Sequence, residues 1–298
     1  METEKELQIY NFYKASGLFF DGRCPICRSQ LDITGKFVSK SLEEPIYYCS
    51  VDKIKISNRY STIFYNMKIT FSQFDTILYY YLQGFTSHQI QLILCPRSPS
   101  IKTIKSYTKM LRSLIHIYVQ NELLTLVMPG PVEVDEACLY RIRKGQIGRI
   151  ARTVYRVFGL KCRSTKRVVL YPAADRTRET LITLIQLHIP QGSKIYTNRF
   201  LAYWNNRTFP HTSYLEPYGY QHLGINHSQH FVSTIDNTIH TNTIERVWRS
   251  IKEKFRNNKP RTNVNRHISE YMFEAWVKPE FRYQFVLSLL AKFQKETH

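Results

Sequence analysis

The chain has 298 residues, 43% of them hydrophobic, and its 42 Lys and Arg against 23 Asp and Glu give a formal net charge of +19. This length and hydrophobic share exclude wholesale disorder and allow one to three folded domains. The charge surplus predicts a polyanionic partner, and nucleic acid fits better than a membrane, because the sequence contains no long amphipathic basic helix, no lipidation signal and no apolar run of about 20 residues.

The beginning of the chain, METEKELQIYNFYKASG, is charged and lacks the apolar core of a signal peptide. Six Cys are scattered along the sequence, and only Cys24 and Cys27 are closely spaced. This usage favours a reducing, intracellular compartment over a disulfide framework. We therefore expect an intracellular protein, located in the nucleus if the host is a eukaryote.

Residues 18–66 contain short β-prone pieces around CPIC and YYCS, and a helical block follows. FSQFDTILYYYLQG, TSHQIQLILC and the basic stretch that begins SIKTIKSYTKMLRSL are separated by Gly84 and by the Pro96–Pro99 region. The last two pieces predict a helix-turn-helix whose second helix recognises DNA. Lys102, Lys105 and Lys109 recur along that helix at three- and four-residue steps, which predicts a phosphate-facing edge. An ordinary solvated Lys face is the alternative.

A linker, MPGP at residues 128–131, precedes a different pattern. VEVDEACL, TVYRVFGLKC and KRVVLYPAAD are three strand-like runs, TRETLITLIQLHI is a helix, SKIYTNRF is a further strand, and a helix follows later. This order describes a ribonuclease H-like α/β domain, in which the side chains of the site come from the first strand, the end of the fourth strand and the late helix. Asp135, Asn198 and Glu245 occupy those three positions.

The late helix lies within HTNTIERVWRSIKEKFR, residues 240–256, and Thr241 is a plausible cap for it. Glu245, Trp248 and Lys252 share one face of this helix. An ordinary amphipathic helix, with Glu245 paired to a basic neighbour and Trp248 in the core, is the alternative to a site. HISEYMFEAWVKPEFRYQFVLSLLAKF then predicts two final helices divided at Pro279.

The sequence resembles the Merlin-type DDE transposases and their bacterial insertion-sequence relatives. The resemblance covers about two-thirds of the chain in the correct order, and NHS followed by HTNxIExxWxxxK is its most specific part. The matching pieces are VEVDE (132–136), Lys144, Gly148-Arg149, VFG (157–159), DRTRETL (175–181), PQGSKIYTNRFLAY (190–203), INHSQHFV (225–232), HTNTIERVWRSIK (240–252) and EYMFEAW (270–276).

This resemblance implies DNA cleavage at transposon terminal inverted repeats and strand transfer into target DNA, with two Mg²⁺ or Mn²⁺ ions held by carboxylates. Such proteins also act on paired DNA ends, so a homodimer is a possible assembly. Asp135 and Glu245 match the first and last acids of the family. Asn242 is a candidate supporting ligand one turn before Glu245, and Lys252 is placed to contact a phosphate.

The pattern departs from the family at Asn198, where the family has the second Asp. An amide oxygen can coordinate a metal but carries no charge, so the positive charge of two hard cations is less well neutralised by their ligands. The first interpretation is therefore a DNA-binding, transposon-derived protein whose catalysis is lost or impaired. The second is an active Mg²⁺-dependent transposase in which Asn242 or Asp175 completes the metal shell. The third is a non-catalytic regulatory module that binds zinc or protein partners.

The family often carries a zinc ribbon before its helix-turn-helix. Here Cys24, Cys27 and Cys49 supply three of four ligands for a possible Zn²⁺, and Asp52 occupies the fourth position. Three thiolates and a carboxylate can bind Zn²⁺, although sulfur-only and sulfur–histidine sets are commoner. A small β module that keeps a remnant thiol pair is the alternative.

A second basic cluster lies between the first two strands of the transposase-like region, where a hairpin would contact DNA. Its residues are Arg141, Arg143, Lys144, Arg149, Arg152 and Arg156. The sequence as a whole predicts four parts. They are a degenerate zinc-ribbon-like module (1–66), a helix-turn-helix region (67–127), a ribonuclease H-like domain (132–260) and C-terminal helices (261–298).

Overall fold

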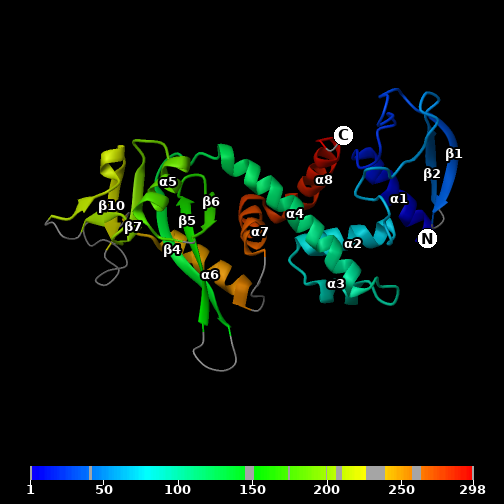
Figure 1. Ribbon diagram of the computed structural model, residues 1–298. Helices are drawn as coiled ribbons and strands as arrows, with labels where there is room; N and C mark the ends of the chain where they lie inside the picture. Colours follow the sequence, from blue (N-terminus) through cyan, green and yellow to red (C-terminus); the bar gives the residue numbers. More distant parts are fainter. Residues whose placement is uncertain are drawn as a thin grey trace. The chain divides into compact units, whose positions relative to one another are not determined.

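The computed structural model describes residues 2–39, 42–144, 151–173, 175–198, 200–205, 210–225, 239–256 and 263–296. The chain forms two compact units, one of residues 1–114 with 277–298 and one of residues 115–276. Helix α4 (Ile101–Thr125) belongs to both, because the boundary falls after Leu114 (Figure 1). None of the helices in this described part of the chain has the length and hydropathy that a membrane span requires.

The first unit combines a small antiparallel sheet with helices. The sheet has the order β1-β2-β3. The elements are α1 (Glu2–Ala15), β1 (Asp32–Ser39), β2 (Leu42–Tyr48), β3 (Lys55–Ser57), α2 (Phe71–Leu82), α3 (Ser87–Ile93), the start of α4, and α8 (Pro279–Glu296). The predicted helices of residues 71–114 are confirmed, whereas α1 was not predicted.

Buried polar contacts tie α1, α2 and α8 together in the first unit. The carboxylate of Glu6 accepts the backbone N–H groups of Phe71 and Ser72 at 2.5 and 2.8 Å, and so satisfies the N-terminus of α2. Asp75 of α2 accepts the hydroxyl groups of both Tyr13 and Tyr283. These bonds connect the beginning of the chain, its helical block and its last helix.

The second unit is built on a mixed five-stranded sheet of order β10-β7-β4-β5-β6. β4 pairs antiparallel with β5 and β5 antiparallel with β6, whereas β7 is parallel to both β4 and β10. The strands are β4 (Val132–Lys144), β5 (Ala151–Cys162), β6 (Val168–Pro172), β7 (Lys194–Asn198) and β10 (Gln221–Ile225). A separate pair is β8 (Trp204–Asn205) with β9 (Thr212–Ser213), and the 3₁₀ helix η1 (Glu216–Tyr218) precedes β10. The first four sheet strands were predicted, and β10 was not.

Helices cover both faces of this sheet. α5 (Arg178–His188) reaches Tyr171 of β6, whose hydroxyl lies 2.7 Å from Nε2 of His188. α6 (Asn242–Arg256) packs on β4 and β5. Since Trp248 of α6 approaches Leu170, the strand neighbour of Tyr171, the two helices lie on opposite faces. α7 (Val264–Trp276) packs on β6, and the predicted division before Pro279 is confirmed, with Pro279 as the first residue of α8.

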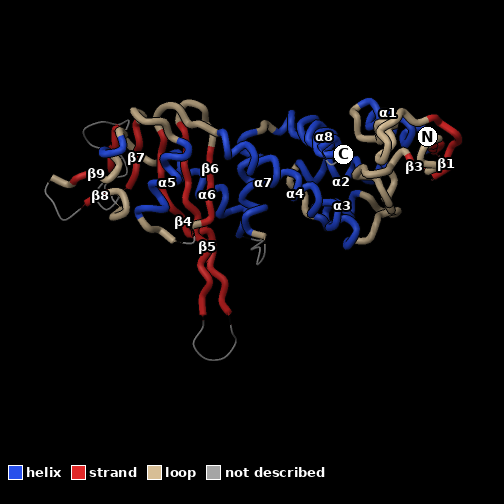
Figure 2. The backbone as a smooth tube through the Cα atoms, turned by 45° about the horizontal axis from the view of Figure 1, so that its top comes forward, coloured by secondary structure: helices blue, strands red, loops and turns tan. Residues whose placement is uncertain are grey.

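The β4–β5 pair continues beyond the rest of the sheet as a two-stranded ribbon, which Figure 2 shows. β7 pairs with β4 only at Val132–Val134, and β6 pairs with β5 only from Val157 to Lys161. The pairing of β4 with β5 nevertheless runs to Lys144 opposite Ala151. The ribbon is thus the hairpin in which the sequence concentrates its second basic cluster.

Candidate active site and metal site

Strand β4 carries the acids Glu133, Asp135 and Glu136. Alternation along a strand places Glu133 and Asp135 on one face and Glu136 on the other. The structure agrees, because Glu133 and Asp135 both contact α6, whereas Glu136 contacts Arg176 and Tyr203. The motif VEVDE therefore serves both faces of the sheet.

Asp135 lies at the convergence of three segments that are far apart in the sequence. Its Oδ1 accepts a hydrogen bond from Nδ2 of Asn198 at 3.0 Å, and its Oδ2 accepts one from Nε1 of Trp248 at 2.9 Å. The pKa of Asp135 is raised to about 6, chiefly by burial; the Trp248 N–H opposes the shift, and the negative charges of Glu136 and Glu245 add to it. Asp135, Asn198 and Glu245 therefore share one site.

The raised pKa of Asp135 predicts a pH-dependent stability of the second unit. The folded value of about 6 exceeds the unfolded value of about 3.9, so the contribution is complete below about pH 4 and is lost as the pH rises through 6. The loss amounts to about 3 kcal/mol of stability between about pH 4 and neutral pH. The melting temperature of the parent should therefore be lower at pH 8 than at pH 5 in part because of Asp135. We expect the Asp135→Asn variant to show a smaller difference in melting temperature between these two pH values. A variant with the same pH dependence as the parent would contradict the assignment.

Asn198 ends β7, and both ends of its amide are engaged. Its Oδ1 accepts the backbone N–H of Phe200 at 3.1 Å, which fixes the orientation of the amide and directs Nδ2 to Asp135. An oxygen must face a backbone N–H, so the opposite orientation would lose this bond. The position thus presents a hydrogen-bond donor to Asp135, where a carboxylate would present a negative charge.

Glu245 lies in the first turn of α6 and is half-buried. The hydroxyl of Thr241 donates to its Oε1 at 3.4 Å. Asn242 is the first residue of the helix, one turn before Glu245, and Lys252 is exposed two turns after it. Asp175, the alternative acid, is exposed and accepts the N–H and the hydroxyl of Thr177, which caps α5.

Glu133 holds the N-terminus of α6, a role that the sequence did not reveal. The side chain is 0% exposed, and its Oε2 accepts the backbone N–H groups of Thr243 and Ile244, each at 2.9 Å. Arg163 Nε lies 2.7 Å and His240 Nδ1 3.5 Å from its Oε1. Two N–H groups at the beginning of α6 are thus bound by a carboxylate from the central strand, in addition to the plausible cap residue Thr241. Because Glu133 and Asp135 belong to the same strand, these two bonds fix the position of Glu245 on α6 relative to Asp135.

Trp248 fits over a glycine that is paired with Asp135. Gly159 of β5 is the register partner of Asp135, and a Cβ at this position would lie 2.4 Å from the Trp248 ring. Trp248 is 5% exposed, which confirms its packing role. It is also a hydrogen-bond donor to Asp135, because the bare backbone at Gly159 lets the indole reach that carboxylate.

We expect Gly159→Ala to destabilise the second unit by about 3 kcal/mol, because the sheet and α6 cannot both keep their positions. The indole N–H resonance of Trp248 should shift as its bond to Asp135 lengthens. Gly35→Ala is the matched control, because its Cβ would meet nothing within 4 Å. Equal melting temperatures for the two variants would contradict this account of the packing.

On the other face of the sheet, Glu136 organises the segment that follows β7. Its carboxylate accepts the hydroxyl of the buried Tyr203 and binds Nη2 of Arg176 at 2.9 Å. The Arg176 guanidinium lies 4.1 Å from the ring centre of Phe200. Because the backbone N–H of Phe200 also orients Asn198, the contacts of Glu136, Arg176 and Phe200 stabilise the end of β7 from the opposite face of the sheet.

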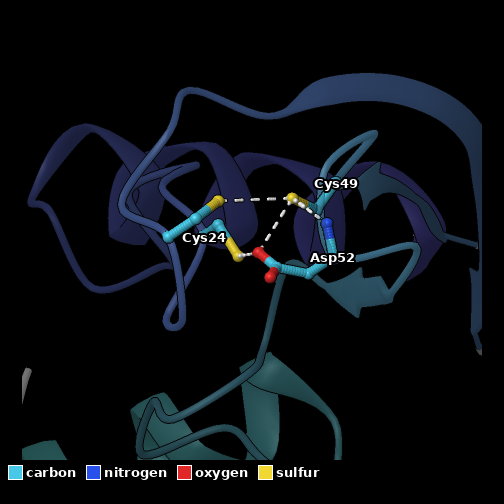
Figure 3. A group of neighbouring side chains, drawn as sticks. Cys24, Cys49 and Asp52 are labelled. Carbon is cyan, nitrogen blue, oxygen red and sulfur yellow. Dashed lines mark hydrogen bonds between the residues drawn. The ribbon is translucent and has the colours of Figure 1, made fainter.

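The Cys cluster of the first unit assembles as a candidate metal site. The donor atoms of Cys24, Cys27, Cys49 and Asp52 all lie within 4.8 Å of one another. Figure 3 shows the Asp52 carboxylate between the sulfur atoms of Cys24 and Cys49, at 3.0 and 3.3 Å from them. Tetrahedral Zn²⁺ with bonds of about 2.3 Å needs donors separated by about 3.8 Å, so small side-chain adjustments would let this group hold the ion. The backbone N–H of Asp52 also donates to the sulfur of Cys49 and lowers the pKa of this thiol.

The DNA-contact residues predicted from the sequence fall in two places. Lys102, Lys105 and Lys109 are exposed on α4, the helix predicted to recognise DNA. Seven residues, 94–100, join α3 to α4. Arg141, Arg143 and Lys144 belong to the ribbon, where the register places Arg143 opposite Arg152. Their side chains lie outside the described part of the structure, and Arg149 lies wholly outside it.

The sheet order and the convergence of Asp135, Asn198 and Glu245 are consistent with a ribonuclease H-like domain of the DDE class. The ISXO2-like transposase domain family matches residues 127–283, slightly more than half of the chain, and the chain belongs to this family. The Merlin-type transposases that the sequence resembles form a related clade. No curated protein matches the chain. The family implies DNA binding and DNA transposition, and DDE transposases use Mg²⁺.

Proposed function

We propose that this protein is a DNA-binding, transposon-derived member of the family in which catalysis is lost or strongly impaired at Asn198. The observation that carries the proposal is the hydrogen bond of 3.0 Å from Asn198 Nδ2 to Asp135 Oδ1. A donor N–H occupies the place where a second carboxylate would bind metal. Replacement of a charged ligand by a donor removes both a coordination bond and a negative charge.

The remaining donor set does not fit two Mg²⁺ ions. Both oxygens of Asp135 face N–H donors, and burial raises the pKa of this group to about 6, so its charge is already disfavoured. Glu245 adds one further carboxylate. Two hard divalent cations in near-octahedral geometry are poorly balanced by two carboxylates, one of them hydrogen-bonded on both oxygens.

DNA binding is supported by charge that is independent of this site. The chain has a formal net charge of +19, and the predicted recognition helix exposes Lys102, Lys105 and Lys109. The ribbon adds Arg141, Arg143 and Lys144, with Arg149 in its connection. We propose that these residues bind DNA phosphates, that the natural target is a terminal inverted repeat, and that the protein acts as a dimer on paired ends.

Two assays test this function. A DNA-binding titration against salt should give an affinity that falls steeply, with a slope of about −0.9 per neutralised phosphate on logarithmic axes. A strand-transfer assay with Mg²⁺ or Mn²⁺ on terminal inverted repeats should give no product. A flat salt dependence would contradict DNA binding, and efficient strand transfer by the parent chain would contradict the loss of catalysis.

We also propose that Cys24, Cys27, Cys49 and Asp52 bind one structural Zn²⁺ per chain. Cys24 and Cys49 already belong to the small core that includes Phe20 and Ile56, so metal binding would tie two loops to this core. We expect Cys49→Ser to lose the metal and to lower the melting temperature of the first unit. Asp52→Cys should retain Zn²⁺ against a chelator longer than the parent does. A parent chain that neither contains nor takes up Zn²⁺ would show that the group is a metal-free remnant.

A further inference from the structure

A cavity lies in the second unit, lined by residues from β5, β6, α4 and the start of α7. Its volume is about 490 Å³, within the range of small-ligand pockets. None of the residues that the catalytic site uses lines it, so it is a distinct feature of this unit. The polar residues of its wall include Arg156, Arg266, His116, Asn263, Asn265 and Tyr155.

The wall of this cavity is positively charged. Arg156 and Arg266 contribute guanidinium groups from two different elements, and no carboxylate occurs among the described residues that line it. Asn263, which immediately precedes α7, and Asn265, in its first turn, add carboxamide groups to the lining. Guanidinium pairs and amide donors together form a binding site for an oxyanion.

His116 reports on the electrostatics of the cavity. Its Nδ1 lies 2.8 Å from the hydroxyl of Ser269, which orients the ring. Burial lowers the pKa of His116, and the positive charge of Arg266 lowers it further. An anion bound at the two guanidinium groups would oppose this effect, so the imidazole is an internal sensor of occupancy.

The position of the cavity indicates which molecule supplies the anion. Arg156 pairs in register with Cys138, at the point where the β4–β5 ribbon leaves the sheet. The ribbon carries the basic residues that we propose to contact DNA. A DNA strand that follows the ribbon would therefore pass beside Arg156, which lines the cavity.

We infer that this cavity binds a phosphate group, and that its source is the backbone of a DNA strand lying along the ribbon. This inference rests on the proposed DNA binding and adds to it a defined phosphate contact that is separate from Asp135, Asn198 and Glu245. Inorganic phosphate and a free nucleotide carry the same chemical group, so the experiment must distinguish these sources from DNA.

The test is an NMR titration of His116 in the full-length protein with labelled histidine. Inorganic phosphate, thymidine monophosphate and a short DNA duplex are added separately, with sodium chloride to equalise ionic strength. We expect bound phosphate to raise the pKa of His116 by about one unit. The double variant Arg156→Gln/Arg266→Gln should lose this increase, whereas Lys166→Gln/Lys194→Gln, which removes two charges outside the cavity, should retain it.

The DNA affinity of the same variants gives the second readout. The slope of log affinity against log salt should become shallower by about 1 in the cavity variant, the value of one lost phosphate contact. A shift with the duplex supports the inference, whereas a shift with phosphate and nucleotide alone would contradict DNA as the source. No shift with any probe, or a shift that survives the loss of both arginines, would overturn it. If the parent chain showed no salt-dependent DNA binding, the proposed function itself would be contradicted.

Discussion

The Asn198→Asp variant is expected to cleave and join DNA in the presence of Mg²⁺ or Mn²⁺ at least about 100 times faster than the parent chain. The substitution changes one atom of a side chain that already lies 3.0 Å from Asp135, so the backbone does not have to move. It replaces an N–H donor with an anionic oxygen and restores the three-carboxylate set that two hard cations require.

The assay is single-turnover cleavage and strand transfer on terminal inverted repeats. Asn198→Ser removes the amide without restoring the charge, and it should stay inactive. Glu245→Gln introduced into the Asn198→Asp chain should abolish the gain, because it removes another ligand. If Asn198→Asp gives no product where the parent gives none, the site has decayed at more positions than Asn198.

The Glu133→Gln variant is expected to lose about 3 kcal/mol of stability in the second unit. Glu133 is 0% exposed and faces Arg163, His240 and the first N–H groups of α6. A neutral amide of the same shape leaves the Arg163 charge uncompensated and weakens the two bonds to the helix N-terminus. For a unit of this size the melting temperature should fall by about 6–12 °C.

Glu179→Gln is the matched control for this experiment. Glu179 also lies in the first turn of a helix, α5, but it is exposed. We expect this change to alter stability by less than about 0.5 kcal/mol. Similar melting temperatures for Glu133→Gln and Glu179→Gln would show that the buried carboxylate does not hold α6.

Local patterns explain why much of this fold was predictable. The β-branched runs of β4, β5 and β6 and the three- and four-residue spacing in α6 are periodic signals that burial imposes. The role of Glu133 at the N-terminus of α6 was not predicted, because Thr241 is the nearest polar residue, whereas Glu133 lies more than 100 positions away. A contact of that kind depends on tertiary placement and leaves no local signal.

The candidate site shows the same division. The family resemblance predicted that Asp135, Asn198 and Glu245 lie together. In the structure Asn198 donates to Asp135 and the charge of Glu245 acts on Asp135, while their catalytic role stays a prediction. The resemblance did not indicate which way the Asn198 amide points, because this depends on the N–H of Phe200. Likewise, the sequence VFG did not indicate why a glycine stands at position 159. The reason is the Trp248 ring, which leaves no space for a Cβ there.

Equilibrium binding of Mn²⁺, followed by electron paramagnetic resonance, tests the central claim most directly and needs no DNA substrate. The two chains to compare are the parent and Asn198→Asp. Each is measured with and without Asp135→Asn, which identifies the metal binding that depends on Asp135. We predict that the parent binds no Mn²⁺ that depends on Asp135, and that Asn198→Asp acquires such binding. A parent chain that binds two Mn²⁺ ions, both lost on Asp135→Asn, would contradict the claim that the Asn198 amide prevents metal binding at this site.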